Sequence, residues 1–144
     1  MRKLFISLCM AGTLAGLASC GTSRTAVTSI DALNGEWKII EVGGHGVKAV
    51  PGEKEAFIGI DAKGKRLYGN TSCNNLVGGF EADAKKGKIS FGQAGSTRMM
   101  CADMETEGKV LDAINKTRSF KMGKGGTLTF KGEDGKPLMK MKKK

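Results

Sequence analysis

Short segments in which apolar and polar residues alternate, separated by turns rich in glycine, restrict the fold of this chain more than any other feature. Residues 88–91, 127–130 and 138–142 each follow this pattern. Because successive side chains of a β-strand point to opposite faces, each segment is predicted to form a strand with one buried face. The residues expected to face inward are Ile89, Phe91, Leu128, Phe130, Met139 and Met141, and those expected to face outward in the last segment are Lys140 and Lys142.

Other segments have the length and composition of short strands. They are predicted at residues 37–42, 57–60 and 66–69, and around Phe120 and Met122. The pair Asp134-Gly135 between two of the alternating segments is a strong hairpin signal. The 22 glycines of the chain fit an antiparallel sheet with many tight turns.

One segment has the spacing of a helix instead. From residue 103 to about residue 116, Val110, Leu111 and Ile114 recur at intervals of three and four. Asp103 is a suitable N-cap, and the acidic residues that follow it favour the positive end of a helix dipole. Gly108 inside the segment costs about 1 kcal/mol relative to alanine.

These elements predict an α+β fold, a curved and mostly antiparallel sheet with one helix packed on it. We expect the sheet to form an incomplete β-barrel. The apolar inward face then has two interpretations, since its side chains either fill the interior or line a pocket on the concave side of the sheet for a small apolar ligand. The shortness of the chain favours the filled interior.

The first twenty residues predict export and lipid attachment. Arg2 and Lys3 precede an uncharged, mostly apolar stretch that ends in Leu17-Ala18-Ser19-Cys20. This ending resembles the lipobox of bacterial lipoproteins, which implies cleavage before Cys20 and diacylglycerol on its thiol. The predicted parts are therefore a signal peptide (1–19), a lipidated Cys20 with a flexible tether (20–30) and a domain (31–144). An ordinary secretory signal and a short membrane span are the alternatives.

The lipid would make the membrane a partner of this protein, because two or more acyl chains anchor a protein stably. Gly21 follows Cys20, so no acidic residue occupies that position. In enteric-type sorting this favours the outer membrane, with the domain facing the periplasm.

The two cysteines of the predicted domain, Cys73 and Cys101, are expected to form a disulfide, because an even pair in an oxidising compartment usually does. Chain entropy assigns roughly 3.5 kcal/mol to such a closure. Two free thiols or a metal-binding pair are the alternatives. The only histidine, His45, lies in a glycine-rich turn, so the chain offers few further ligands for zinc, and no metal or cofactor is expected.

The charge of the chain is strongly positive. The formal net charge is +10, and from Lys121 onward 8 lysines face only Glu133 and Asp134. This lysine-rich C-terminal region is a candidate surface for an anionic envelope component or an envelope protein. A solvated face with a frayed tail at 142–144 is the favoured interpretation. Nucleic acid is not an expected partner, because no aromatic residues are interleaved with the basic ones.

Three motifs together resemble the META/HslJ family of bacterial lipoproteins and related domains. They are Leu33-Asn34-Gly35-Glu36-Trp37, then Gly69-Asn70-Thr71-Ser72-Cys73-Asn74-Asn75 followed by Gly78-Gly79-Phe80, and then Thr97-Arg98-Met99-Met100-Cys101. Ser72 stands where the family usually has glycine, and Phe80 where tyrosine is common. The resemblance implies an incomplete barrel with one helix, an envelope location, and links to stress or antibiotic tolerance in some members. It implies no reaction.

We interpret the motif residues as structural, namely Trp37, Asn74, Gly78, Thr97, Arg98 and Met99. Arg98 is expected to pair with Asp103 or Glu105, and none of the acidic pairs, including Glu53 with Glu55 and Glu105 with Glu107, is expected to be buried. No catalytic residue is predicted. The expected function is that of an exported, lipid-anchored, non-enzymatic envelope protein that contributes to envelope integrity or stress and antibiotic tolerance by binding a protein or an envelope component. The alternatives are the small apolar-ligand binder and a protease inhibitor that uses the loop at residues 43–53.

Overall fold

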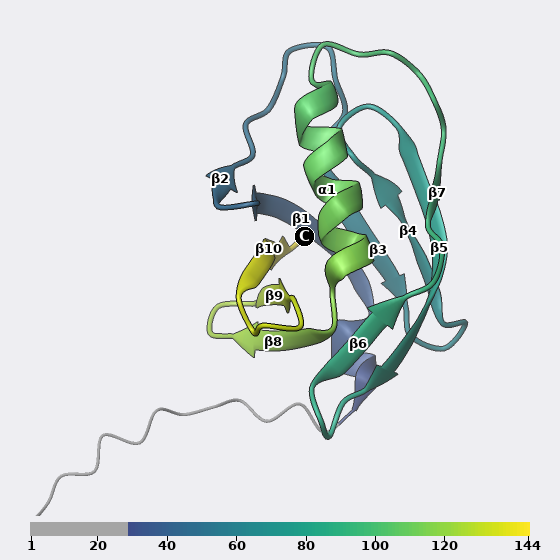
Figure 1. Ribbon diagram of the computed structural model, residues 1–144, viewed down its shortest axis with the longest axis vertical. Helices are drawn as coiled ribbons and strands as arrows, with labels where there is room; N and C mark the ends of the chain where they lie inside the picture. The colour runs from purple at the N-terminus through teal and green to yellow at the C-terminus, as the bar shows by residue number, and fades with distance from the viewer. Residues whose placement is uncertain (1–28) are drawn as a thin grey trace, which may run out of the picture.

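A computed structural model describes residues 29–144. The predicted signal peptide, the predicted lipid attachment at Cys20 and most of the tether lie outside the described residues. The described part begins with a short 3-10 helix, η1 (Ile30–Leu33), which leads directly into the first strand (Figure 1). Within residues 29–144, no helix combines the length and the apolar character needed to cross a membrane.

The main body is an antiparallel sheet that closes on itself. Its strands, in spatial order, are β10 (Pro137–Lys143), β9 (Thr127–Lys131), β8 (Ser119–Gly123), β6 (Lys88–Phe91), β5 (Asn75–Asp83), β4 (Arg66–Asn70), β3 (Phe57–Asp61) and β1 (Gly35–Val42). Two short strands extend this sheet, with β2 (His45–Gly46) paired to β1 and β7 (Gly95–Ser96) paired to β5.

The barrel is closed, which corrects the prediction of an incomplete one. β10 pairs with β1 from Trp37 opposite Lys143 to Val42 opposite Met139. The alternation in both strands is visible in the sequence, but the pairing joins the first and the last strand of the domain. The pattern of apolar and polar residues in one strand does not identify the strand that pairs with it. The sequence therefore predicted the individual strands but not the pairing that closes the barrel.

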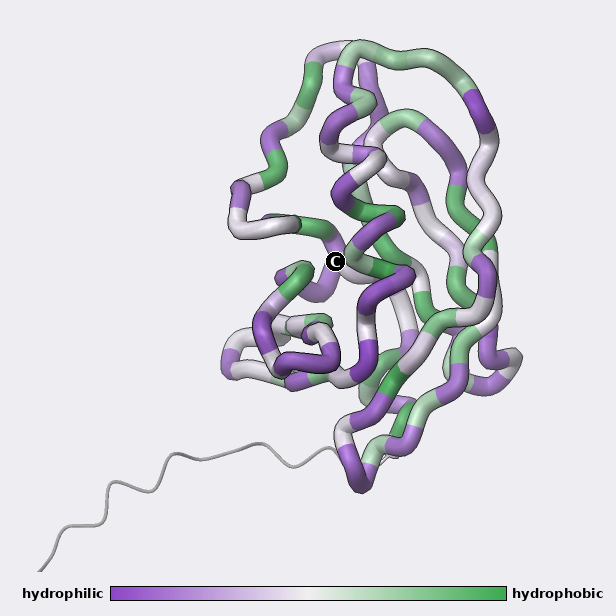
Figure 2. The backbone as a smooth tube through the Cα atoms, viewed as in Figure 1, coloured by the Kyte–Doolittle hydropathy of each residue, from purple (hydrophilic) through white to green (hydrophobic). Residues whose placement is uncertain are grey.

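The inward and outward faces agree with the predicted alternation, and the six predicted inward residues are all buried. Figure 2 shows hydrophobic and hydrophilic residues alternating along much of the barrel. Phe91 joins two parts of the interior, with its ring centroid 6.3 Å from that of Phe80 and 5.2 Å from that of Phe130. These contacts connect β5, β6 and β9 through the interior, so the core is packed across the barrel as well as along it.

The predicted helix is confirmed as α1 (Met104–Lys116), with Asp103 as its N-cap. It packs against β1, β6 and β10 and buries Val110, Ala113 and Ile114. Between β6 and β8 only Lys88 and Ser119 are paired in register, so this is the narrowest seam of the barrel.

The longest strand, β5, was not predicted as a strand. The sequence was interpreted as a turn around Asn74 and Asn75, and the turn indeed occupies residues 71–74, but Asn75 already begins β5. Gly78 and Gly79 in its middle lower β-propensity and hide the alternation of Leu76 with Phe80. Pairing with β4 and β6 on its two edges compensates for this weak local preference.

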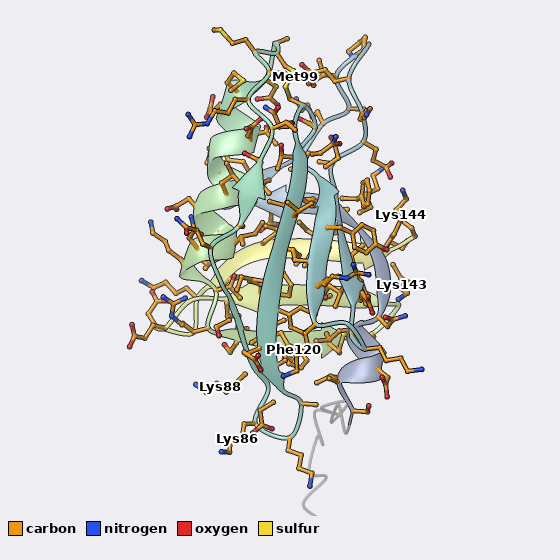
Figure 3. The ribbon with its side chains drawn as sticks, turned by 90° about the vertical axis from the view of Figure 1, so that its right-hand side faces the viewer. Lys86, Lys88, Met99, Phe120, Lys143 and Lys144 are labelled. Atoms are coloured by element: carbon orange, nitrogen blue, oxygen red, sulfur yellow. A yellow bond between two sulfur atoms is a disulfide. The ribbon has the colours of Figure 1, made fainter. Side chains whose placement is uncertain are left out.

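The C-terminal lysines do not form a frayed tail, contrary to the favoured expectation. Lys143 is the last residue of β10, its Nζ lies 4.4 Å from the centre of the Trp37 ring, and it donates to the Asn34 carbonyl. Lys144 Nζ lies 3.1 Å from Glu36 Oε2 and 4.5 Å from the centre of the Phe57 ring. Lys143 and Lys144 (Figure 3) therefore connect the end of β10 to β1 and to the residues next to it.

Candidate functional site

The loop at residues 97–103, between β7 and α1, arches over one end of the molecule (Figure 1). Figure 3 labels Met99 at that end and Lys86 at the opposite one. Three large apolar side chains of this region face solvent, with exposed fractions of 54% for Met99, 94% for Met100 and 43% for Met104. A cluster of exposed methionines next to an exposed arginine, Arg98, is unusual for a surface with no partner.

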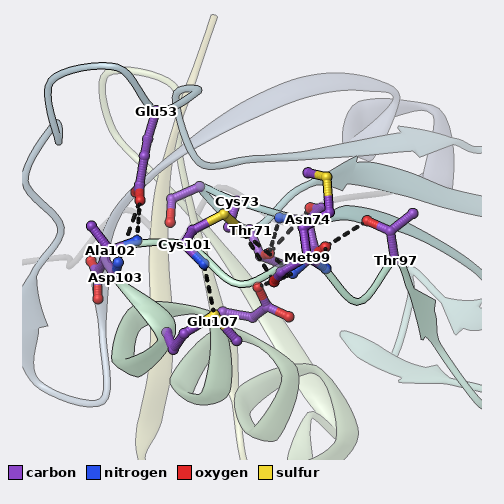
Figure 4. Close-up of a disulfide and its surroundings, with 12 residues drawn as sticks. Glu53, Thr71, Cys73, Asn74, Thr97, Met99, Cys101, Ala102, Asp103 and Glu107 are labelled. Atoms are coloured by element: carbon purple, nitrogen blue, oxygen red, sulfur yellow. Dashed lines mark hydrogen bonds between the residues drawn. A yellow bond between two sulfur atoms is a disulfide. The ribbon is translucent and has the colours of Figure 1, made fainter.

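A single buried side chain fixes this loop from below. Asn74 is fully buried, and its Oδ1 accepts hydrogen bonds from Thr97 Oγ1 (2.7 Å) and from the Met99 N–H (2.8 Å) (Figure 4). Its Nδ2 donates to the Met99 carbonyl (3.0 Å). One amide thus holds both neighbours of Arg98, and uses its donor and its acceptor for this purpose.

Cys73 and Cys101 meet beside this amide. The structure places them as a disulfide pair, with Cα atoms 5.9 Å apart, a separation usual for disulfides. The placement agrees with the disulfide prediction, and would join the turn that carries Asn74 to the end of the loop. Within residues 29–144, no group of three or more His, Cys, Asp or Glu side chains is arranged to hold a metal ion.

Two acidic residues support the loop from positions where burial was not expected. Glu107 is only 6% exposed, and its Oε2 accepts from Asn74 Nδ2 at 2.6 Å. Glu53, on the loop between β2 and β3, accepts from the backbone N–H groups of Ala102 (2.9 Å) and Asp103 (3.4 Å), with one oxygen buried and without a partner. The spacing of Glu107 to Val110 and Ile114 already placed it on the apolar helix face. No sequence signal connects Glu53 to residues so distant in the chain.

The expected pairing of Arg98 with Asp103 or Glu105 is wrong. Asp103 Oδ1 instead accepts from the Thr106 N–H (2.9 Å), and Glu105 pairs with Lys109 (2.6 Å). Hydrogen bonding from Lys109 and its charge lower the pKa of Glu105. Arg98 forms no ion pair with any described residue and is exposed to solvent. Both carboxylates interact with groups of α1, one with a backbone N–H and the other with Lys109, so neither is available to Arg98.

Ser72, which stands where the resemblance to the META/HslJ family would place glycine, has a glycine-like backbone conformation. Ser72 has φ +90°, a conformation that residues with a side chain seldom adopt. Its hydroxyl is buried and has no hydrogen-bond partner among the described residues. The substitution noted in the sequence is therefore accommodated with strain, directly before Cys73.

The other motif residues lie in the barrel, apart from the loop. Trp37 donates its indole N–H to the Leu33 carbonyl at 2.7 Å, which ties the start of β1 to η1. A Cβ added at Gly78 would lie 3.4 Å from the Ala94 Cα, at the limit of ordinary van der Waals contact, so the connection after β6 passes close to β5 at this point. The structural interpretation of these two residues is consistent with their surroundings.

The arrangement fixes an exposed loop rather than assembling a nucleophile with a base. The Thr97 hydroxyl donates to the Asn74 amide oxygen, which is not basic enough to accept its proton. His45 is exposed, and its Nδ1 lies 2.9 Å from the Gly43 carbonyl oxygen. This end of the molecule therefore presents Arg98 and exposed methionines on a loop that Asn74 holds in place.

A second surface gathers cations on the outside of the barrel. The strand register places Lys121 beside Thr129 and Thr129 beside Lys140, and places Lys142 beside Thr127. Lys131 and Lys88 both lie beside Ser119 on the same outer face. We call this set the cationic face; its residues are Lys88, Lys121, Lys131, Lys140 and Lys142. Of these, only Lys140 forms an ion pair with a described acid, Glu41, at 3.6 Å, although Asp83 of β5 lies opposite Lys88 in the register.

Comparisons with known proteins agree with this fold and these motifs. No curated protein matches the chain in sequence. An NMR structure of a protein from Burkholderia xenovorans is 16% identical, with a TM-score of 0.64 over 94% of this chain and 99% of that one. A crystal structure of a DUF4847 family protein from Bacteroides vulgatus is 12% identical, with a TM-score of 0.53 over 78% of this chain and 94% of that one. These likenesses concern the fold, whereas the family model for the META domain matches residues 28–144. The chain therefore belongs to the META domain family.

Proposed function

We propose that this META-domain protein is an exported, lipid-anchored module of the bacterial cell envelope that binds phosphate-bearing anionic lipid through its cationic face and has no catalytic activity of its own. In this role it contributes to envelope integrity under stress, including antibiotic stress. The observation that carries the proposal is the cationic face, because four of its five lysines form no ion pair with a described residue.

Charge complementarity supports an anionic lipid surface as the binding partner. Lysines that flank the same threonine or serine on one face of a sheet lie about one Debye length apart, so their positive potentials add at the surface. Thr129 lies between Lys121 and Lys140 and offers a hydroxyl donor to phosphate oxygens. Each lysine near an anionic bilayer contributes about 1 kcal/mol of attraction.

The position of the cationic face is compatible with attachment of the domain to a membrane through its N-terminal end. Lys88 lies toward the same end of the molecule as Lys86, the end opposite Met99 (Figure 3). The described chain also begins at that end, with η1 (Figure 1). A lipid on Cys20, outer-membrane sorting and periplasmic exposure of the domain are parts of the proposal, and this orientation would bring Lys88 close to the bilayer.

The packing of the interior favours this proposal over the small apolar-ligand binder. The side chains that would line a concave pocket, among them Leu128, Phe130 and Met141, are completely buried against each other. A hollow of about 430 Å³ does exist, but Asp61, Arg66 and Tyr68 are among its lining residues and it lies outside the core. The apolar residues of the barrel therefore act as core.

Vesicle binding tests the role of the cationic face. The domain is produced without residues 1–19 and with Cys20→Ser, so that the anchor does not dominate, and is mixed with vesicles of phosphatidylglycerol and phosphatidylcholine in equal amounts. We expect the triple change Lys121→Gln, Lys131→Gln and Lys142→Gln to weaken partitioning roughly 100-fold, as the loss of three lysine contacts implies. Raising the salt concentration should weaken binding in the same direction.

A matched control removes the same charge elsewhere. Lys48→Gln, Lys54→Gln and Lys63→Gln alter three exposed lysines outside the cationic face. This variant should retain most of the binding. Equal losses in both triple variants, or equal binding to vesicles of phosphatidylcholine alone, would show that the cationic face is not a lipid-binding surface.

Intact mass of protein isolated from membranes tests the anchor and the disulfide together. We expect the mass of a chain that begins at Cys20 and carries acyl chains, with two cysteines that alkylate only after reduction. A chain that retains residues 1–19, or that lacks acyl mass, would remove the lipid anchor from the proposal. Alkylation of Cys73 and Cys101 without reduction would establish free thiols instead.

A further inference from the structure

The backbone around Arg98 contains neither helix nor turn. The chain runs without a turn from residue 95 to residue 101, continuing the direction of β7. The Thr97 N–H donates inward to the Asn75 carbonyl (3.1 Å), and the Met99 N–H and carbonyl both bond inward to Asn74. Because backbone groups alternate along an extended chain, those of Arg98 and Met100 point outward.

The outward groups of this loop are available for a partner. Neither Arg98 nor Met100 makes a backbone hydrogen bond to another described residue. An extended segment with alternate free N–H and C=O groups can pair with the edge of a partner's sheet, which supplies affinity through the main chain and specificity through one side-chain pocket. Arg98 is the residue whose side chain is exposed and without an acidic partner.

We propose that this loop binds in the active-site cleft of a trypsin-like serine endopeptidase and inhibits it, with Arg98 in the acidic specificity pocket. The Arg98–Met99 peptide bond then lies at the position where such an enzyme cleaves. From the sequence, residues 43–53 were considered as the loop of a protease inhibitor. We propose the loop at residues 97–103 instead. The proposal is independent of the cationic face and of lipid binding.

The same contacts explain why the loop would inhibit rather than be digested. The enzyme's serine oxygen would add to the Arg98 carbonyl carbon, its proton would pass through the catalytic histidine to the Met99 nitrogen, and the C–N bond would break. Met99 would remain in place, because Asn74 holds its carbonyl at 3.0 Å and Cys101 is positioned by Cys73. The retained amine would attack the acyl ester and re-form the peptide bond, with the high effective concentration of an intramolecular reaction.

The exposed methionines fit the flank of such an interface. Met99 and Met100 follow the proposed cleavage position, and Met104 lies at the adjacent start of α1. Methionine and arginine are enriched at protein interfaces, and methionine adapts its shape to irregular surfaces. Preorganisation adds affinity, because a loop already fixed by Asn74 loses little conformational entropy on binding.

Inhibition of purified trypsin is the test. The full chain is expressed, purified from membranes in mild detergent and titrated against trypsin with a small chromogenic substrate. We expect stoichiometric inhibition by the wild type, and an inhibition constant raised at least about 100-fold by Arg98→Ala. Arg98→Phe should lose trypsin inhibition and gain inhibition of chymotrypsin. Lys63→Ala, which removes an exposed cation from a different turn, should inhibit like the wild type.

The bracing of the loop is tested by following cleavage. Thr97→Val and Asn74→Ala should be cut by trypsin after Arg98 at least about tenfold faster than the wild type, as detected by intact mass. Thr97 is exposed, so Thr97→Val keeps the test valid if Asn74→Ala does not fold. The proposal is overturned if the wild type leaves trypsin fully active, or if trypsin cleaves the wild type after Arg98 as fast as it cleaves Thr97→Val.

Discussion

Ser72 combines two local costs at one position, a positive φ and a buried hydroxyl without a partner. We expect Ser72→Gly to raise the free energy of unfolding by about 1 kcal/mol, because glycine adopts φ +90° without steric strain, less the entropy it gains when unfolded. Ser72→Ala is the control, since it removes the hydroxyl but keeps the strained backbone. Urea denaturation of the three proteins gives the comparison. A glycine variant no more stable than the alanine variant would mean that φ carries no strain here.

For single residues, the sequence identified which side chains belong to the motifs but not the contacts that they make. Asn74, Thr97 and Met99 were recognised as a motif, but the contacts that join them span more than twenty residues of chain. The burial of Glu107 could be deduced from its helix face, whereas the contacts of Glu53 could not. Side-chain partners far apart in sequence are decided by the fold, and local patterns do not encode them.

The N-cap of α1 makes the stability of that helix depend on pH. Hydrogen bonds from the Thr106 side chain and then from its backbone lower the pKa of Asp103, and the charge of Lys109 lowers it further. A carboxyl whose pKa is lower in the folded state stabilises the fold above its ordinary value of about 3.9, and this contribution is lost as the pH falls through the lower, folded-state pKa.

We therefore expect the loss of stability below about pH 4 to be less steep in Asp103→Asn, in which asparagine still caps the helix but does not titrate. Thr106→Val, which removes one of the hydrogen bonds, should lie between this variant and the wild type. Urea denaturation at a series of pH values measures the slope. Identical acid slopes in all three proteins would contradict this account of the cap.

Among the helices and strands, the alternation of apolar residues or their helical spacing was sufficient to predict an element wherever its local preference agreed with its place in the fold. α1, β6, β9 and β10 were predicted with nearly their observed bounds because their apolar residues repeat at the right period. β5 was missed because its two central glycines conceal that repeat, and its pairing on both edges decides its structure. The very short β2 and β7 depend wholly on the strands that they join.

At the scale of the whole molecule, the end of β10 is expected to contribute to closure of the barrel. Deleting Lys143 and Lys144 should lower the urea midpoint, because the contact of Lys143 with Trp37 alone is worth about 0.5–1 kcal/mol and a backbone pairing is lost with it. Fluorescence of Trp37, the single tryptophan, reports the transition. The control Lys143→Gln with Lys144→Gln keeps the backbone, and its midpoint should fall between those of the deletion and the wild type. An unchanged midpoint after the deletion would contradict this role.

The pairing of β1 with β10 also sets the time at which this protein can become folded. β1 is synthesised first among the barrel strands and β10 last, so a chain that is threaded across a membrane from its N-terminus delivers β1 long before its partner. During that interval one edge of β1 has unpaired backbone groups, and open edges of this kind favour aggregation. In the proposed export, passage would be complete before the barrel closes, and a chain interrupted ahead of β10 would emerge with β1 still open to other chains.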